Sequence, residues 1–368
     1  MKAPRVILSG GGTGGHIFPA VAIANEIKKN HPDAEILFVG ALGRMEMEKV
    51  PAAGYKIIGV PIAGLQRKLT LANLKLPFLI IRSLLATRKI IKEFKPDVAV
   101  GTGGYASGPL LRAAASKGIP FVLQEQNSYA GITNKLLSKN ASKICVAYEG
   151  MEKFFPKEKL MLTGNPVRQD LSRPGNLKEE AIAFFGLKTN VKTVLVIGGS
   201  LGARTINEAL LAKLNNFSEA GVQVLWQTGK MYYPKIKEQL SQSNPSHVHA
   251  HEFITRMDLA YAAADIVISR AGASSVSELC NLGKASILVP SPNVAEDHQT
   301  KNALALVNKK AAVLVKDSDA QELLVSTAIA QLRDEEGLRK LSESAMAMAF
   351  PNAAQEIAKE VLKLVERT

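Results

Sequence analysis

The sequence offers few means of cross-linking the chain, holding a metal through thiolates or crossing a membrane. Its 368 residues include 2 cysteines, Cys145 and Cys280, one in each half of the chain. This excludes a disulfide framework and gives no basis for a cysteine-based metal site. The apolar run at residues 6–8 is too short for a secretory signal. The longest apolar stretch, residues 71–95, is interrupted by basic residues and a proline, which excludes a spanning helix. We therefore expect a cytosolic protein.

Acidic residues are outnumbered by basic ones. The chain has 46 Lys and Arg against 33 Asp and Glu, a net charge of +13. Such a charge favours an anionic partner: nucleic acid, an anionic membrane surface or a phosphate-bearing ligand. No nucleic-acid-binding motif accompanies the charge, so we do not expect nucleic acid as a partner.

Short β-branched runs such as RVIL, DVAVG, TVLVIGG and DIVIS alternate with helical patterns along the whole chain. This alternation predicts an α/β fold, in which doubly wound parallel sheets are covered by helices on both faces. Residues 193–214 repeat the order of strand, glycine turn and helix that is predicted for residues 5–27. This weak internal repeat predicts two Rossmann-like domains.

The expected domain boundary lies at TGNPVR, where a glycine and a proline interrupt regular structure. We expect residues 1–163 to form the first domain, together with a C-terminal helix at about residues 346–368. Residues 164–345 are expected to form the second domain.

Three glycine-rich turns follow predicted strands: GGGTGGH at residues 10–16, GTGGYASG at 101–108 and GGSLGAR at 198–204. Such a turn exposes backbone N–H groups, and the helix after it begins with partial positive charge. Together these features hold phosphate or sugar oxygens without a metal. The structural alternative is that glycine only permits a tight turn, but three turns at equivalent places favour function.

The first turn also matches the dinucleotide fingerprint G-x-G-x-x-G with Gly10, Gly12 and Gly15. A nicotinamide site needs an acid at the end of the second strand to hold the ribose. Here the strand EILFVG runs into Ala-Leu instead. Arg44 could serve a 2′-phosphate, so an NADP-dependent oxidoreductase stays open as an alternative.

Polar residues follow two strands of the second half. Ser275 and Glu278 have the spacing of a capping box. Alternatively, the Glu278 carboxylate accepts hydrogen bonds from both hydroxyls of a ribose. The segment SPNVAEDHQTKNA, residues 291–303, clusters acids, amides and a histidine. Such a loop suits a sugar, whose hydroxyls need both donors and acceptors.

These blocks, taken in order, resemble one enzyme family. GGGTGGHIFPAVAIANEI, GTGGYASGP, EQNSYAGITNKLL, GNPVR, GGSLGAR, EFI, RAGASSVSEL and EDHQTKNA are similar to blocks of the bacterial peptidoglycan GlcNAc transferases, over about residues 5–305. The resemblance implies the GT-B architecture, in which two Rossmann-like domains face each other across a cleft. It implies transfer of N-acetylglucosamine from UDP-GlcNAc to undecaprenyl-diphospho-MurNAc-pentapeptide (lipid I), which gives lipid II. It implies no metal and no other cofactor.

The resemblance also assigns residues to the two substrates. Arg168 and Ser200 would contact the donor diphosphate, and the backbone near Ile254 the uracil. Glu278 would bind the ribose and Gln299 the GlcNAc hydroxyls. The full donor set is Thr13, Gly14, Gly15, Arg168, Ser200, Gly202, Ile254, Ala273, Ser274, Glu278, His298 and Gln299. The acceptor set is Gly104, Tyr105, Glu125, Asn127 and Asn134. His298 stands where some relatives have glutamine, which leaves its sugar contact open.

In this family an α-linked donor gives a β-1,4 product, so the resemblance implies inversion by one displacement from the acceptor 4-hydroxyl. That reaction needs a base near the hydroxyl and stabilisation of the departing UDP. His16 is the candidate base, because a histidine side chain ordinarily titrates near neutrality. The alternative is that His16 orients the turn or the acceptor.

Residues 65–95 mix apolar and basic side chains. This pattern is typical either of a core helix with a solvated basic face or of peripheral binding to an anionic leaflet. A lipid-linked acceptor favours the second, at the cytoplasmic face of the cell membrane, with other cell-wall synthesis proteins as further candidate partners. The expected membrane-binding residues are Leu71, Leu74, Lys75, Phe78, Leu79 and Arg82.

Two metal-like patterns favour structural explanations. Residues 317–319, Asp-Ser-Asp, directly precede a helical pattern, so we expect a helix cap rather than a metal site. His247, His249 and His251 would lie on one face of a strand. Because no fourth ligand accompanies them, we expect an exposed strand face.

A further alternative is another enzyme of the same architecture, such as a glycolipid glycosyltransferase or a UDP-GlcNAc 2-epimerase. The epimerase would need acidic catalytic groups in its cleft and no lipid acceptor. It would not favour the basic apolar stretch at residues 65–95.

Overall fold

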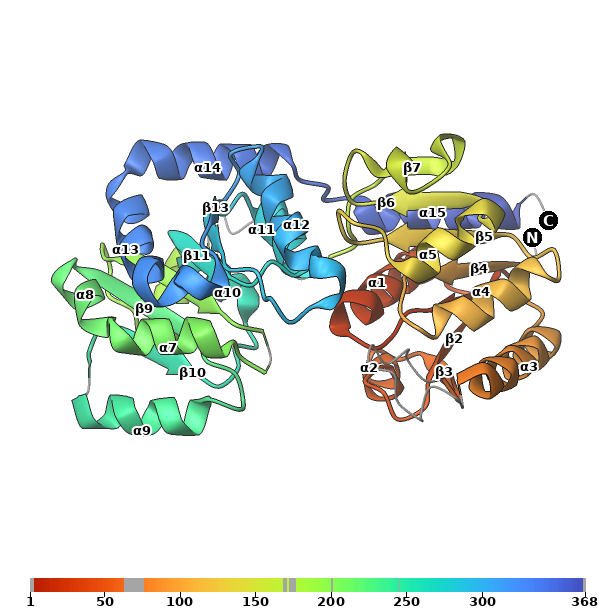
Figure 1. Ribbon diagram of the computed structural model, residues 1–368, viewed down its shortest axis with the longest axis horizontal. Coiled ribbons are helices and arrows are strands. Elements are labelled where there is room, and N and C mark those ends of the chain that lie inside the picture. The colour runs from red at the N-terminus through yellow and green to blue at the C-terminus, as the bar shows by residue number, and fades with distance from the viewer. Residues whose placement is uncertain are drawn as a thin grey trace. The chain divides into compact units, whose positions relative to one another are not determined.

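The structure is a computed structural model that describes residues 3–62, 76–167, 171, 177–199, 201–243 and 245–366. The chain divides into two compact units (Figure 1). Unit 1 comprises Met1–Arg168 and Phe350–Thr368, and unit 2 comprises Gln169–Ala349. Each unit is a parallel sheet with its own helices, which confirms the predicted α/β fold of two Rossmann-like domains.

Unit 1 contains a seven-stranded sheet in the order β3-β2-β1-β4-β5-β6-β7. The strands are β1 (Arg5–Ser9), β2 (Glu35–Ala41), β3 (Lys56–Val60), β4 (Val98–Gly101), β5 (Phe121–Glu125), β6 (Lys143–Val146) and β7 (Leu160–Leu162). The helices are α1 (Gly14–Asn30), α2 (Glu46–Ala52), α3 (Leu76–Phe94), α4 (Ser107–Ala115), α5 (Ile132–Leu137) and α15 (Ala353–Val365).

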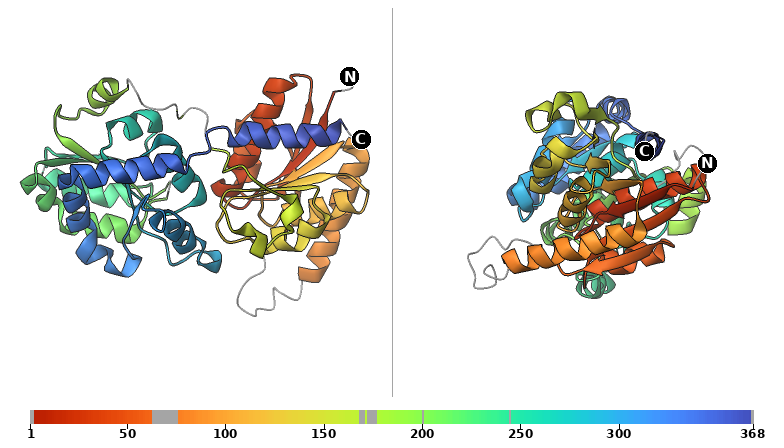
Figure 2. Two further views of the ribbon diagram at one scale, coloured as in Figure 1. Left: turned by 90° about the horizontal axis from the view of Figure 1, so that it is seen from above. Right: turned by 90° about the vertical axis from the view of Figure 1, so that its right-hand side faces the viewer.

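Strand β1 shows why this sheet is covered on both faces. Val6 and Leu8 join the core cluster of α1 and α15, whereas Ile7 joins the opposite cluster, which includes residues of α3 and α4. Alternate strand residues point to opposite faces, so a continuous apolar run requires helices on both. The last helix, α15, returns to pack against α1 (Figure 2).

Unit 2 contains a six-stranded sheet in the order β10-β9-β8-β11-β12-β13. The strands are β8 (Lys192–Ile197), β9 (Val222–Gln227), β10 (Val248–His251), β11 (Ile266–Ser269), β12 (Ser286–Leu288) and β13 (Val313–Leu314). The helices are α6 (Lys178–Phe185), α7 (Arg204–Ala212), α8 (Leu214–Glu219), α9 (Tyr233–Ser243), α10 (Met257–Ala263), α11 (Ala273–Leu282), α12 (His298–Val307), α13 (Ala320–Arg333) and α14 (Glu335–Ala347).

The first strand of each unit lies inside its sheet, with the second strand on one side and a later strand on the other. In unit 1, β1 pairs with β2 and β4, and in unit 2, β8 pairs with β9 and β11. The strand order therefore reverses direction beside β1 and β8. Ligands of doubly wound sheets bind at the carboxyl ends of the strands at such a point.

The units divide after Arg168 and before Phe350, a few residues beyond the expected boundaries at 163 and 346. The segment after β7 stays with unit 1 because its backbone and side chains bond there. Gly164 N donates to Val146 O at 3.2 Å, and Asn165 Nδ2 donates to Gln126 O at 2.9 Å.

One structural expectation was wrong, and a second was confirmed only in part. His247, His249 and His251 are half-buried rather than on an exposed face. Burial lowers the pKa of both His249 and His251. Asp319 precedes α13 as its N-cap residue but makes no side-chain cap bond. Asp317 instead forms an ion pair with Arg270 at 2.5 Å and accepts a bond from Thr205 Oγ1 at 3.0 Å.

Within the described part of the chain, no group of three or more His, Cys, Asp or Glu side chains is arranged to hold a metal ion. Among those same residues no helix is both long and apolar enough to span a bilayer.

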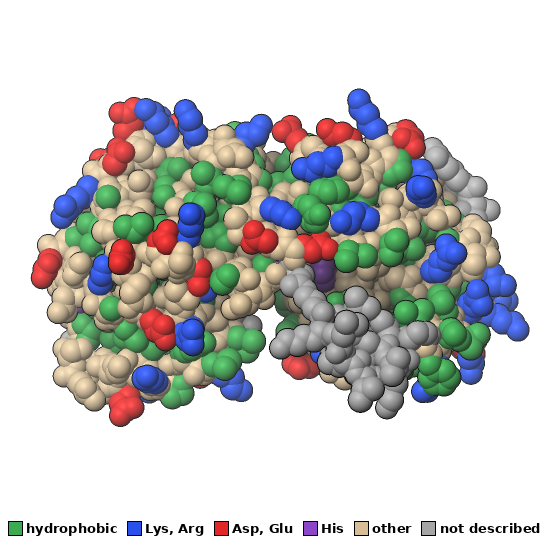
Figure 3. Space-filling view, in the orientation of Figure 1, with side chains coloured by type: hydrophobic (Ala, Val, Ile, Leu, Met, Phe, Trp, Pro, Cys, Tyr) green, Lys and Arg blue, Asp and Glu red, His purple; other side chains and the backbone are tan. Residues whose placement is uncertain are grey.

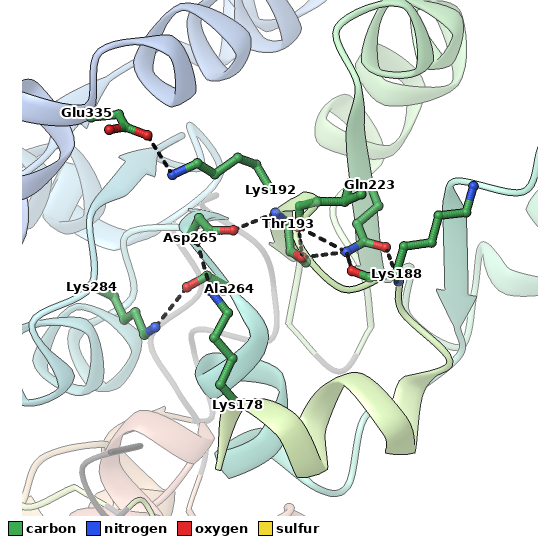
Figure 4. Close-up of polar contacts among 10 residues, drawn as sticks. Lys178, Lys188, Lys192, Thr193, Gln223, Ala264, Asp265, Lys284 and Glu335 are labelled. Atoms are coloured by element: carbon green, nitrogen blue, oxygen red, sulfur yellow. Dashed lines mark hydrogen bonds and ion pairs between the residues drawn. The ribbon is translucent and has the colours of Figure 1, made fainter. Parts of the chain in front are cut away.

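Polar side chains join the amino ends of β8 and β11 in unit 2 (Figure 4). Asp265 Oδ2 accepts from Thr193 N at 2.7 Å, and Lys178 Nζ lies 3.4 Å from Asp265 Oδ1. Lys284 Nζ donates to Ala264 O at 2.8 Å. Burial lowers the pKa of Lys284 to about 8, although the negative charge of Asp265 acts to raise it.

The lowered pKa of Lys284 predicts a stability that depends on pH. Unfolded lysine titrates near 10.4, so between about pH 8 and pH 10 the unfolded chain binds more protons at this residue than the folded chain. The free energy of unfolding should therefore rise with pH in the native chain relative to Lys284→Met, by up to about 1.4 kcal/mol per pH unit. Urea unfolding at pH 7.5 and 9.5 measures this difference.

Lys192→Met is the matched control, because Lys192 is exposed and its ion-pair partner Glu335 is 80% exposed. The difference in the free energy of unfolding between Lys192→Met and the native chain should be the same at pH 7.5 and pH 9.5. If the difference in the free energy of unfolding between Lys284→Met and the native chain is also the same at both pH values, the prediction is contradicted.

Candidate functional site

The glycine turns after β1 and β4 touch each other through their backbones. Gly11 N donates to Gly103 O at 3.4 Å. Gly104 has φ +83°, and a Cβ at this position would lie 2.2 Å from Gly11 O. A Cβ at Gly103 would lie 2.9 Å from the His16 ring. Only glycine permits both the backbone conformation and this approach, so the two turns form one structure at the carboxyl edge of the sheet.

His16 lies in the first turn of α1, over this contact. Its Nδ1 is 3.0 Å from Thr102 O and 2.8 Å from Gln126 Oε1. Thr102 Oγ1 in turn donates to His16 O at 2.7 Å. Both partners of Nδ1 are oxygen acceptors, so Nδ1 carries the proton of the neutral ring and Nε2 carries the lone pair. None of the described residues bonds to Nε2, which makes it a suitable proton acceptor.

The expected acceptor residues of the loop after β5 bond mainly to one another. Glu125 is 2% exposed, and its carboxylate accepts from Gly131 N at 3.0 Å and from Asn134 Nδ2 at 2.8 Å. It also accepts from Asn127 N at 3.1 Å. Glu125 therefore holds this loop in shape. Tyr105, on the neighbouring turn, is 55% exposed.

In unit 2, Ala273, Ser274 and Glu278 lie on α11, which follows β11. The N-cap residue is Gly272, in extended conformation, with no side-chain cap bond. Ser275 is thus already inside the helix, which argues against the capping-box alternative for Ser275 and Glu278. Glu278 is half-buried, and its Oε2 accepts from Tyr261 OH at 3.0 Å.

Gln227, at the end of β9, connects two segments of the expected donor site. Its Oε1 accepts from Ile254 N at 2.9 Å, and its Nε2 donates to Gly199 O at 3.3 Å. Gly202 N donates to Gly199 O within the same turn. The Ile254 N–H is thus satisfied inside the protein. No pattern in the sequence indicated this role of Gln227.

The loop before α12 has an unusual backbone. Glu296 and Asp297 have φ values of 55° and 52°, a left-handed conformation that non-glycine residues seldom adopt. Strain of this kind is typical of functional loops. Gln299 Oε1 accepts from Ser291 N at 2.9 Å. His298 is the first residue of α12. Arg168 and Ser200 lie outside the described residues.

Helix α1 follows β1, the first strand of unit 1. In unit 2, α7 follows the first strand, β8, and α11 follows β11, which pairs with β8. None of them has an acidic residue in its first turn, and their N-cap residues Thr13, Ala203 and Gly272 make no side-chain cap bond. The N–H groups and the positive dipole ends of these helices therefore suit anionic ligands.

Two family models match the chain, one in each half. Residues 6–146 match the glycosyltransferase family 28 N-terminal domain, and residues 193–361 match the glycosyltransferase family 28 C-terminal domain. The chain belongs to glycosyltransferase family 28. Membership excludes the oxidoreductase alternative and confirms that the chain is a glycosyltransferase of GT-B architecture.

Relatives in family 28 match over the whole chain. A protein of Parabacteroides distasonis is 60% identical over 367 residues, and both chains are covered completely. One of Phocaeicola vulgatus is 57% identical, with 99% of this chain and 97% of the relative covered. Both are named UDP-N-acetylglucosamine--N-acetylmuramyl-(pentapeptide) pyrophosphoryl-undecaprenol N-acetylglucosamine transferase. The crystal structure of Acinetobacter baumannii MurG is 29% identical, with TM-score 0.80, 98% of this chain covered and 99% of that chain.

The candidate site of unit 1 contains a further anchor that the sequence pattern did not indicate. Glu46, in α2, is fully buried and accepts from Gly12 N at 2.9 Å and from Ala41 N at 3.0 Å. An acid therefore does follow the second strand, but it bonds to the glycine turn itself. Because Gly12 N is occupied, an anion on this turn would have to use the N–H groups of residues 13–15.

Proposed function

We propose that this family 28 enzyme transfers GlcNAc from UDP-GlcNAc to the 4-hydroxyl of MurNAc in lipid I, which gives lipid II. The observation that carries the proposal is His16, whose Nε2 holds a free lone pair beside the glycine turns of unit 1. The names of relatives that are 57–60% identical over the whole chain support the choice of substrates.

In this proposal unit 2 binds the donor. The start of α11 and the turn after β8 offer N–H groups to the diphosphate, and Arg168 adds a positive charge. Glu278 binds the ribose, and Gln299 the sugar. The negative charge that develops on UDP is stabilised by these groups, so the reaction does not depend on a metal ion.

Unit 1 binds the acceptor and supplies the base. The N–H groups of Thr13, Gly14 and Gly15, which the resemblance assigns to the donor, are offered here to anionic oxygen of the acceptor. Gly104, Tyr105 and Asn127 line the acceptor side, and the buried Asn134 supports them through its bond to Glu125. His16 Nε2 takes the proton of the 4-hydroxyl as its oxygen attacks the anomeric carbon. The bond to UDP breaks in the same displacement, which inverts the anomeric centre.

The test measures UDP release from UDP-GlcNAc with and without a soluble lipid I analogue, and identifies the product by mass spectrometry. We expect release only with the acceptor, and the same rate in the presence of a chelator. His16→Gln should lower kcat by about 100-fold or more, with KM for UDP-GlcNAc within a few fold.

The control is His31→Gln, at the C-terminal end of α1, which should transfer normally. Release that does not depend on the acceptor would contradict the substrate assignment. Near-normal turnover by His16→Gln would contradict the role of base.

We further propose that α3 carries peripheral binding to an anionic membrane at its cytoplasmic face, where UDP-GlcNAc is available. Phe78, Ile81 and Leu85 are 63%, 56% and 58% exposed. Their spacing places them on one side of the helix, and the Arg82 guanidinium lies 5.8 Å from the centre of the Phe78 ring. Hydrophobic and basic side chains gather over this helix at the right of Figure 3.

Of the other expected membrane residues, Leu79 is half-buried, and Leu71, Leu74 and Lys75 lie outside the described residues. The exposed face continues with basic residues further along the helix, at Arg88, Lys89 and Lys92. An apolar stripe bordered by positive charge suits an anionic leaflet.

Co-sedimentation with phosphatidylglycerol and phosphatidylcholine vesicles tests this proposal. The native chain should pellet with the anionic vesicles and less in high salt, because salt screens the attraction. The double substitution Phe78→Ser with Ile81→Ser should lower the bound fraction several-fold. The control is Leu323→Ser on α13, where Leu323 is 49% exposed. Equal binding to both kinds of vesicle would contradict the proposal.

A further inference from the structure

Three buried amide side chains of unit 1 form a directional chain of hydrogen bonds that ends at His16. Asn165 Nδ2 donates to Gln126 O at 2.9 Å. Asn165 Oδ1 then accepts from Gln124 Nε2, also at 2.9 Å. Gln124 Oε1 accepts from Gln126 Nε2, and Gln126 Oε1 lies 2.8 Å from His16 Nδ1. Each amide thus presents its nitrogen to one neighbour and its oxygen to the next.

The polarity of this chain is fixed by its surroundings. Gln126 Nε2 also donates to Thr102 O at 2.6 Å and to Gln124 O at 3.1 Å. If the Gln126 amide were turned by 180°, its oxygen would face three other oxygens. Gln124, Gln126 and Asn165 are at most 3% exposed, so water cannot replace lost bonds without cost. The Gln126 oxygen is therefore held against His16.

An oxygen held at this place decides which ring nitrogen carries the proton. The hydrogen bond made by one nitrogen of histidine sets the state of the other. With Nδ1–H directed at Gln126 Oε1 and Thr102 O, the lone pair lies on Nε2. In the opposite tautomer an unprotonated Nδ1 would face two oxygens, and Nε2 would have no lone pair to offer.

We propose that Gln126 is a positioning residue that holds His16 in the Nδ1–H tautomer and so keeps Nε2 basic. The proposal rests on the function proposed above, in which Nε2 takes the acceptor proton. Thr102 O, 3.0 Å from Nδ1, supports the same tautomer. Removal of Gln126 should therefore weaken the preference rather than abolish it.

The test reads the tautomer directly from the ring 15N chemical shifts of protein labelled at histidine. The His16 signals are those missing from His16→Gln. In the native chain we expect a protonated Nδ1 and an unprotonated Nε2 in the neutral ring. Gln126→Met keeps the volume but removes the oxygen, so a measurable fraction with Nε2–H should appear, and kcat should fall about 10-fold. KM for UDP-GlcNAc should stay within twofold.

Gln126→Glu provides a second arm. A carboxylate beside the ring favours the charged imidazolium, so the acidic limb of the kcat/KM profile should move to higher pH. The matched control is Gln223→Met in unit 2, because Gln223 is 1% exposed and bonds to Lys188 and Thr193. This control should lose stability but keep the His16 signals and the pH profile.

A native His16 ring with Nε2–H would overturn the proposal, even if neither Gln126 variant folds. So would an unchanged tautomer in Gln126→Met together with an unchanged pH profile in Gln126→Glu. The ring spectrum needs no substrate. If the native chain fails to transfer GlcNAc while Nδ1 carries the proton, the proposed function fails and the role of Gln126 in setting the tautomer stands.

Discussion

The backbone contact between the turns after β1 and β4 is the constraint on which the candidate site of unit 1 depends. Gly104 approaches the Gly11 carbonyl so closely that a side chain at Gly104 has no room. The contact brings Thr102 to the first turn of α1, where it bonds to both the backbone and the ring of His16. Glu46 fixes the other side of the first turn through Gly12 N. The His16 imidazole is thus oriented mainly by backbone and buried groups.

Unit 2 uses a similar contact but with a different neighbour. A Cβ at Gly202 would lie 2.2 Å from Thr228 O, and one at Gly229 would lie 2.1 Å from Gly202 N. There the turn after β8 is packed against the turn after β9, whereas in unit 1 the turn after β1 is packed against the turn after β4. The start of α11, which carries Glu278, takes no part in that contact. Because different turns pack together in the two units, the two related sheets present different groups at their carboxyl ends.

Much of the fold could be predicted from the sequence, because buried parallel strands require β-branched runs and the glycine turns mark where each run ends. His16 could be singled out because it directly follows such a turn. Glu46 could not, because its role depends on a helix that returns its carboxylate to the first turn. The capping-box alternative for Ser275 and Glu278 could not be excluded from the sequence for a similar reason. Helix α11 begins at Ala273, after an extended Gly272, and this start depends on where β11 ends. The partners of Glu125 and Gln126 also depend on the pairing of strands distant in sequence.

The most direct test of the account compares Gly104→Ala with Gly118→Ala in GlcNAc transfer. Both glycines have positive φ, +83° and +71°, but a Cβ at Gly118 would have nothing within 4 Å. The two substitutions therefore share the cost of the backbone conformation, and only Gly104→Ala forces the turns apart. We expect Gly104→Ala to lower kcat by at least about 100-fold while UDP affinity is unchanged, and Gly118→Ala to transfer normally. Near-normal turnover by a folded Gly104→Ala would contradict the account.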